Sequence, residues 1–215
     1  MIRQTLLKTQ AATFCVELPN PNQHGMPTHT GTGFFVSPDG WFVTAAHVIT
    51  ENNKSDGPAR KDLSQAWLMK ETRLPGAMPG AMCQAVSLGH VIPRLDFALL
   101  KINFAANASK AWLVGNTEFP FLGVSKRQLD EGESVYSFGY PRSSAFAQSL
   151  GAVVTGTTTL CPRVTSAIVS STLEATQMVM TQGDPQVYVL DKALNYGNSG
   201  GPIVSSQTGR AHAFC

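Results

Sequence analysis

The sequence is poor in charged residues and has no long apolar run. Asp, Glu, Lys and Arg make up 14% of its 215 residues, against about 25% in an average soluble domain. The longest cluster of cations is the pair Lys126 and Arg127, and the formal net charge is +2. No basic surface that could neutralise several phosphates is therefore expected. No stretch reaches the 18 apolar residues that a membrane-spanning helix needs. These absences argue against nucleic acid and against a membrane as partners.

Neither the cysteines nor the first residues indicate a metal site, a disulfide framework or a secretory signal peptide. Cys15, Cys83, Cys161 and Cys215 lie far apart and form no Cys-x-x-Cys pair, so neither a zinc site nor a dense disulfide frame is predicted. We expect reduced, buried thiols, no metal and no cofactor. The apolar core of residues 1–10 is too short for a secretory signal. The expected location is cytoplasmic, or periplasmic or secreted if a leader has been removed.

Turn-forming residues, by contrast, are numerous. The 19 Gly and 13 Pro divide the chain into short apolar segments, which favours strands over long helices. Residues 31–36 and 41–44 flank a Pro-Asp-Gly turn and predict a β-hairpin. Helices are expected only in the first ten residues and over residues 45–49. Further strands are expected over residues 65–70, 83–92, 97–102, 134–139, 152–158, 167–170, 186–190 and 202–204. This pattern predicts an all-β barrel or sandwich.

A serine near the C-terminus is enclosed by glycines. Residues 197–202 read Gly-Asn-Ser-Gly-Gly-Pro, and glycines allow backbone N–H groups to turn toward one point. A serine hydroxyl is a weak nucleophile at neutral pH. Acyl transfer therefore needs an imidazole base, a carboxylate that orients it, and hydrogen-bond donors for the oxyanion. Ser199 is the candidate nucleophile, and the rest of the chain must supply the base and the carboxylate.

One histidine and one aspartate are suitably placed beside strands. His47 lies three residues after the strand expected over residues 41–44, and Asp96 precedes the apolar strand expected over residues 97–102. Taken singly, each is more often an ordinary core, surface or turn residue. The chain order His, Asp, Ser is much more specific, because it is one of the orders in which a catalytic triad is assembled. An α/β-hydrolase would need the serine first and crossover helices between parallel strands, and both requirements fail.

Four motifs together resemble the trypsin-like serine proteases of the chymotrypsin fold. They are Gly-Thr-Gly-Phe at residues 31–34, Thr-Ala-Ala-His-Val at 44–48, Asp-Phe-Ala-Leu-Leu at 96–100 and Gly-Asn-Ser-Gly-Gly-Pro at 197–202. The Gly-Thr-Gly motif, Asn198 before the serine, and Gly-Tyr-Pro at residues 139–141 are most similar to the bacterial high-temperature-requirement (HtrA) branch. The resemblance covers roughly residues 28–215, and it implies an all-β fold of two antiparallel six-stranded β-barrels.

The resemblance also implies how the chain is divided. Residues 1–215 would form a single protease domain, with an N-terminal segment at 1–27, a first barrel at 28–110 and a second barrel at 111–215. Only 16 residues follow Ser199, whereas the family continues with a segment that walls the substrate pocket and with a closing helix. The second barrel is thus expected to lack its C-terminal end. Either the sequence is part of a longer chain, or the site is built differently.

By the same resemblance, single residues receive roles. His47 would act as general base and then as general acid, Asp96 would orient its ring, and Ser199 would attack the substrate carbonyl. The backbone N–H groups of Gly197 and Ser199 would form the oxyanion hole. Ala193 would be the uncharged floor of the substrate pocket.

An uncharged pocket floor favours a small or medium apolar residue before the scissile bond, although Asp191 lies nearby as an alternative floor. Asn198 stands where trypsin-like zymogens carry the aspartate that pairs with a new N-terminus, so gating by loop ordering or by a partner is expected instead of cleavage. The expected function is a serine endopeptidase that acts on protein or peptide substrates, with an activating partner or a further domain in a longer chain. The alternative is a binding or regulatory module that keeps the fold without turnover.

Overall fold

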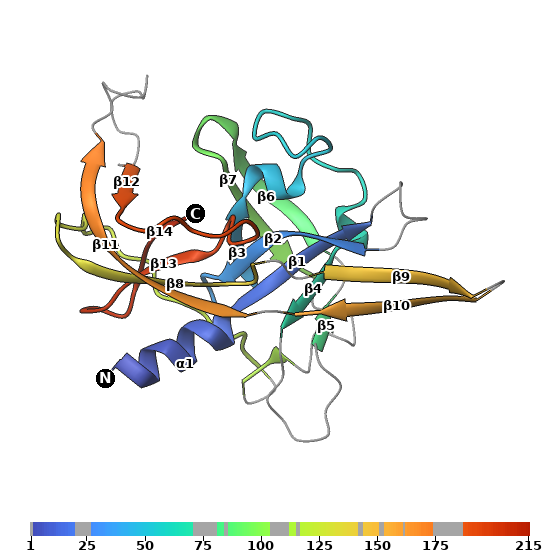
Figure 1. The fold of residues 1–215 in the computed structure, drawn as a ribbon, viewed down its shortest axis with the longest axis horizontal. Helices are drawn as coiled ribbons and strands as arrows, with labels where there is room; N and C mark the ends of the chain where they lie inside the picture. Colours follow the sequence, from blue (N-terminus) through green and yellow to red (C-terminus); the bar gives the residue numbers. More distant parts are fainter. Residues whose placement is uncertain are drawn as a thin grey trace.

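The chain folds almost entirely into β-strands, in a computed structural model that describes residues 2–19, 27–70, 81–83, 86–103, 112–114, 117–141, 144–150, 153–160, 162–173 and 187–215. These residues form fourteen strands, one α-helix and three short 3₁₀ helices (Figure 1). The 3₁₀ helices are η2 (Ala46–Ile49), η3 (Leu63–Gln65) and η4 (Pro93–Leu95). The strand pairs are antiparallel, which confirms the all-β fold class expected from the sequence.

Seven of the described strands form the first sheet, in the order β5-β4-β1-β2-β3-β7-β6. They are β1 (Thr13–Pro19), β2 (Pro27–Phe35), β3 (Trp41–Ala45), β4 (Trp67–Lys70), β5 (Ala81–Cys83), β6 (Val86–Ile92) and β7 (Phe97–Ile102). Strands β2 and β3 are the hairpin predicted around the Pro-Asp-Gly turn. Gly40 ends this turn with φ at +93°, a value that glycine adopts without strain. Aromatic rings of Phe14, Phe35, Phe42 and Trp112 pack together in the core of this sheet.

Strand β1 is an element that the sequence pattern did not predict. It pairs with β2 on one side and with β4 on the other, and every residue from Thr13 to Leu18 is buried. A strand that is covered on both faces lacks the alternation of polar and apolar residues that marks a half-buried strand. The first sheet therefore includes part of the segment 1–27, and it begins earlier than the expected boundary at residue 28.

The second sheet has five strands in the order β12-β11-β8-β13-β14. They are β8 (Ser134–Gly139), β11 (Arg163–Leu173), β12 (Val187–Leu190), β13 (Pro202–Ser205) and β14 (Ala211–Phe214). The remaining two strands, β9 (Ser144–Leu150) and β10 (Val153–Thr159), pair with each other and extend away from the rest of the molecule as a ribbon (Figure 1). The described strands thus divide into seven, five and two, and two antiparallel sheets side by side are consistent with the expected double barrel.

Helix α1 (Ile2–Ala12) precedes β1 and packs where the two sheets meet. Thr9 Oγ1 lies 3.2 Å from the hydroxyl of Tyr136 on β8. Apolar residues from both sheets form one shared cluster beside the helix: Phe34 and Val43 from the first, and Tyr136, Val204 and Ala211 from the second. This cluster holds the two sheets in a fixed relation, which any site between them requires.

Two of the four cysteines lie in the described part of the chain with their side chains. Cys15 is buried, and Cys215 is a half-buried free thiol whose pKa is raised to about 11 by burial. The side chain of Cys83 and the whole of Cys161 lie outside the described residues. In the described ranges, no helix combines the length and the apolarity needed to cross a membrane.

Candidate active site

His47 and Asp96 are brought together by the pairing of β3 with β7. His47 lies in η2, directly after β3, and Asp96 directly precedes β7. Ala45, the last residue of β3, is opposite Phe97, the first residue of β7. Because the two strands are antiparallel, Ala46, the residue after β3, lies beside Asp96, and its N–H donates to the Asp96 carbonyl at 2.8 Å. His47 is the next residue along the chain. Two side chains separated by 49 positions in the sequence thereby become neighbours.

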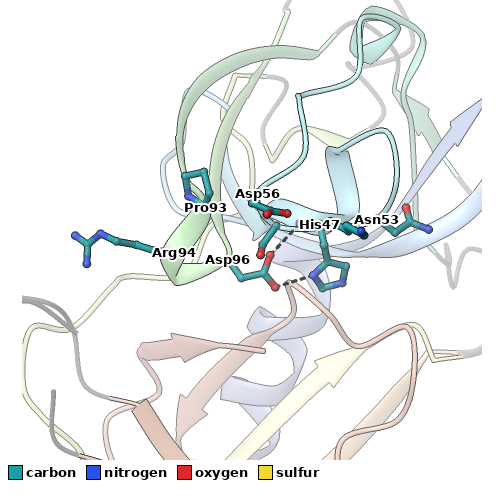
Figure 2. A pocket seen from close by; sticks show the side chains of 8 residues that line it. His47, Asn53, Asp56, Pro93, Arg94 and Asp96 are labelled. Carbon is teal, nitrogen blue, oxygen red and sulfur yellow. Dashed lines mark hydrogen bonds and ion pairs between the residues drawn. The ribbon is translucent and has the colours of Figure 1, made fainter. Parts of the chain in front are cut away.

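Both carboxylate oxygens of Asp96 accept hydrogen bonds from His47 (Figure 2). Oδ2 lies 2.6 Å from the ring nitrogen Nδ1, and Oδ1 lies 2.9 Å from the backbone nitrogen of His47. An ionised carboxylate can only accept, so Nδ1 carries the proton and Nε2 keeps its lone pair. The side chains of His47 and Asp96 are 29% and 38% exposed. The ring is therefore held by Asp96 at Nδ1 and is partly exposed, an arrangement in which a neutral ring can accept a proton at Nε2.

The candidate nucleophile lies in a tight turn between β12 and β13. Gly197 has φ at +99° and Gly200 has φ at +84°, both in the left-handed region that favours glycine. A Cβ at Gly200 would lie 2.2 Å from the carbonyl oxygen of Thr32 and 2.3 Å from Oγ1 of Thr44. The turn around Ser199 is thus pressed against β2 and β3. Only glycine at position 200 permits this approach to the strand that leads to His47.

Hydrogen bonds hold this turn from two sides. On the first sheet, the backbone N–H of Thr32 donates to the carbonyl of Ser199 at 2.8 Å, and the Thr32 hydroxyl donates to the carbonyl of Gly197 at 2.8 Å. On the second sheet, the N–H of Gly200 donates to the carbonyl of Cys215, whose own N–H donates to Gly201 at 2.9 Å. The turn is therefore fixed between the two sheets.

Two backbone donors of this turn make no hydrogen bond within the described part of the protein. Across the described residues, no hydrogen-bond partner is recorded for the N–H of Gly197 or for the N–H of Ser199. The same residues show no hydrogen bond between Ser199 Oγ and the His47 ring. The structure thus brings His47 and Asp96 into direct contact, and it attaches the Ser199 turn to the strands beside them.

A hollow of about 730 Å³ adjoins the His47–Asp96 pair. It is lined by the pair itself, by residues 53–56 of the loop after η2, and by Pro93 and Arg94 before Asp96. In Figure 2, Arg94 points away from the pair. Ala193 does not line this hollow and is exposed. The carboxylate of Asp191, the alternative pocket floor, instead accepts the N–H of Ile168 on β11 at 2.8 Å.

Several residues of this region were not singled out from the sequence. Thr32 is part of the Gly-Thr-Gly motif, and Thr44 is part of the motif that contains His47. Both therefore lie in motifs recognised from the sequence, but neither was assigned a role. The loop over residues 53–56 also lines the hollow. It is held by Thr50, whose hydroxyl donates to the carbonyl of Lys54 at 2.6 Å, a bond that loop composition does not predict.

Comparison with known proteins agrees with this geometry. Residues 31–213 match the family model of the trypsin-like peptidase domain. The chain is 28% identical over 182 residues to serine protease HTRA4 of Homo sapiens and 29% identical over 189 residues to serine protease HTRA4 of Mus musculus. It is also 28% identical over 181 residues to serine protease HTRA1 of Xenopus laevis.

These alignments cover 84%, 87% and 84% of the chain, but 29%, 29% and 30% of the respective relatives. The chain thus spans less than a third of the length of the relatives that it matches. The three are vertebrate proteins, so they give no support to the bacterial branch that the sequence motifs favoured. The family model nevertheless extends from β2 to β14 and includes every strand of the second sheet. The chain therefore belongs to the trypsin-like peptidase family.

Proposed function

We propose that the chain is a serine endopeptidase domain that hydrolyses peptide bonds through an acyl-enzyme. The observation that carries this proposal is the contact between His47 Nδ1 and Asp96 Oδ2 at 2.6 Å, at the end of the strand against which the Ser199 turn packs. A carboxylate in this position fixes the tautomer of the ring and stabilises the imidazolium that forms during acyl transfer. Membership of the trypsin-like peptidase family supports the same reaction class.

In the proposed reaction, Nε2 of His47 takes the hydroxyl proton of Ser199 while Oγ attacks the substrate carbonyl carbon. The negative charge that develops on the carbonyl oxygen would meet the unpartnered N–H groups of Gly197 and Ser199. The C–N bond then breaks as His47 returns the proton to the leaving amine. A water molecule, deprotonated by the same ring, hydrolyses the resulting ester and regenerates Ser199. The hydrogen bond from Ser199 to His47 would form when substrate binds, as such bonds often tighten in the complex.

Asn198 supports an activity that needs no cleavage of the chain at its N-terminus. It is 2% exposed, and its Oδ1 has no hydrogen-bond partner among the described residues. A neutral amide offers no charge that a newly formed N-terminus could pair with. Control would instead come from the ordering of loops around the site or from a partner. Ala193 as an uncharged pocket floor would favour small or medium apolar residues before the scissile bond.

The test is labelling with a fluorophosphonate probe, which reacts only with an activated serine. We expect the wild-type chain to be labelled and Ser199→Ala to remain unlabelled, because the probe needs both the Ser199 hydroxyl and the His47 base. Ser206→Ala, which removes a partly buried serine of the turn directly after β13, serves as the matched control and should label like the wild type.

Fluorogenic peptides then examine specificity. Peptides with alanine or valine before the scissile bond should be cleaved faster than those with arginine or lysine. A folded wild-type chain that neither labels nor cleaves would contradict the proposal and favour a binding module with a protease fold.

A further inference from the structure

Thr32 is a buried residue of β2 whose hydroxyl accepts one hydrogen bond and donates another. The side chain is 0% exposed. Its Oγ1 accepts the backbone N–H of Tyr140 at 3.1 Å and donates to the carbonyl of Gly197 at 2.8 Å. A backbone N–H can only donate, so the single hydroxyl proton is left for Gly197. The direction of both hydrogen bonds is therefore determined, and the hydroxyl joins the end of β8 to the nucleophile turn.

The backbone of Thr32 contacts the other parts of the site. Its N–H donates to the carbonyl of Ser199 at 2.8 Å, and its carbonyl accepts the hydroxyl of Thr44 at 2.7 Å. The same carbonyl is the atom closest to Gly200, against which any added Cβ would collide. Thr44 lies on β3, the strand that leads to His47. One residue thus contacts both ends of the nucleophile turn and the strand of the candidate base.

The contact with Gly197 orients backbone groups that have no side chain to hold them. A trans peptide is planar, so fixing its carbonyl oxygen also fixes its N–H. The peptide between Gly197 and Asn198 is held by the Thr32 hydroxyl at one end and by the bond from Asn198 N–H to the Asn195 carbonyl at the other, at 3.0 Å. The next carbonyl, that of Asn198, accepts the N–H of Gly201 at 2.7 Å. The N–H of Ser199, in the same peptide as this carbonyl, therefore points the opposite way.

We propose that Thr32 is a positioning residue for the catalytic turn. Its hydroxyl fixes the peptide between Gly197 and Asn198. This peptide connects the two neighbouring peptides whose N–H groups, those of Gly197 and Ser199, would face the substrate carbonyl oxygen. This inference rests on the proposed endopeptidase function, because orientation of the turn is useful only if those two groups stabilise an oxyanion. Without the hydroxyl, the N–H of Tyr140 and the carbonyl of Gly197 both lose a buried partner, and the turn loses its fixed plane.

The test compares two substitutions at this one position. Thr32→Val keeps the shape and removes the hydroxyl, whereas Thr32→Ser keeps the hydroxyl and removes a methyl group. For Thr32→Val, we expect kcat and the rate of fluorophosphonate labelling to fall roughly 10- to 100-fold, since small displacements of transition-state donors have effects of this size. KM should change by less than about threefold, because the lost interaction acts on the transition state. Thr32→Ser should stay within about threefold of the wild type in both quantities.

Thr13→Val is the matched control for loss of a buried hydroxyl. Thr13 is likewise 0% exposed, and its hydroxyl donates to the carbonyl of Thr9 at 2.7 Å. This variant should show a lower thermal midpoint with an unchanged labelling rate. If Thr32→Val does not fold, Thr32→Ala makes the same comparison with a smaller side chain.

The outcomes separate this inference from the proposed function. Folded Thr32→Val that labels at the wild-type rate overturns the positioning role while leaving the endopeptidase function intact. Folded Thr32→Ser that is as slow as Thr32→Val also overturns it, because the methyl group would then be responsible. A folded wild type that shows no labelling through Ser199 overturns the proposed function and this inference together.

Discussion

Glu17 shows how the burial of one residue sets a pH dependence. The side chain lies in β1, is 0% exposed, and its Oε2 has no hydrogen-bond partner among the described residues. Burial penalises the charged form and raises the pKa of Glu17 to about 7 from the usual 4.5. The folded chain therefore holds a proton that the unfolded chain has released between these two values. Its contribution to stability is complete below pH 4.5 and is lost as the pH rises through about 7.

Substitution of Glu17 by glutamine removes this titration. We expect Glu17→Gln to be more stable than the wild type at pH 8, by on the order of 3 kcal/mol, because the amide has no charge to bury. Near pH 4, where both the folded and the unfolded wild type bind the proton, the difference should vanish. Urea unfolding at both pH values measures the free energies of unfolding. A difference that does not depend on pH would show that the carboxyl is not buried as the structure places it.

Asp96, the partner of the candidate base His47, makes several contacts at once. Asp96 accepts two hydrogen bonds from His47 through its carboxylate, and its carbonyl accepts the N–H of Ala46 at 2.8 Å. It adopts φ of +50°, which aspartate tolerates better than most residues. The motif around Asp96 was visible in the sequence. Its hydrogen bonds to the backbone of η2 were not, because they depend on where β3 ends.

Strand β1 lies between β4 and β2 in the first sheet, so its removal should disrupt the sheet. A chain that starts at residue 28, the barrel boundary expected from the sequence, loses β1 and leaves β2 and β4 without their shared neighbour. We expect this shortened chain to be unfolded or aggregated, because two adjacent strands would have unpaired backbone groups. A chain that starts at Thr13 keeps the strand and should fold, with lower stability because α1 is missing.

Circular dichroism and size-exclusion chromatography of the two shortened chains measure this difference. The chain that begins at Thr13 is the control for shortening as such. Cooperative unfolding of the chain that begins at residue 28, at the wild-type midpoint, would show that β1 is dispensable.

The strands differ in how well their sequences predict them. Strand β7 alternates between half-buried and buried residues, so its period of two was readable, and the hairpin β2–β3 has a characteristic turn. Strand β1 is buried throughout, and a short apolar run of this kind has no diagnostic period. Strand β9 was also not expected from the sequence, whereas a strand was expected over residues 152–158, where its partner β10 lies.

At the scale of the whole molecule, the site depends on how the two sheets are docked. The rings of Phe97 and Phe214 meet across the sheets with centroids 5.7 Å apart. Phe97 directly follows Asp96, and Phe214 directly precedes Cys215, whose carbonyl holds Gly200. This one aromatic contact therefore links the carboxylate of the candidate triad to the nucleophile turn.

Truncation of Phe214 should affect stability and labelling together. We expect Phe214→Ala to lower the free energy of unfolding by about 1–3 kcal/mol, because a half-buried ring loses its packing. Labelling of the folded protein by a fluorophosphonate should fall as well. Phe121→Ala removes another half-buried ring, packed against the first core, and should lower stability without slowing the labelling. Equal labelling rates for the two folded variants would show that docking at Phe214 does not tune the site.

The residue types that the proposed chemistry needs, and their order along the chain, could be read from the sequence. His47, Asp96 and Ser199 each stand in a short motif, and the glycines beside Ser199 meet a local backbone requirement, as the φ of +84° at Gly200 illustrates. Local requirements of this kind are readable because they involve neighbours in the chain. The all-β class followed from turn residues and short apolar runs in the same way.

The groups that hold those residues in place could be identified only from the folded chain. The Thr32 hydroxyl joins Tyr140 and Gly197, which are 108 and 165 positions away in the sequence. The central position of β1 depends on partners in β2 and β4, and Ala193 is exposed and lies apart from the hollow beside His47. Such placements are set by strand register and sheet docking, which depend on burial summed over the whole chain. No local pattern in the sequence encodes that sum.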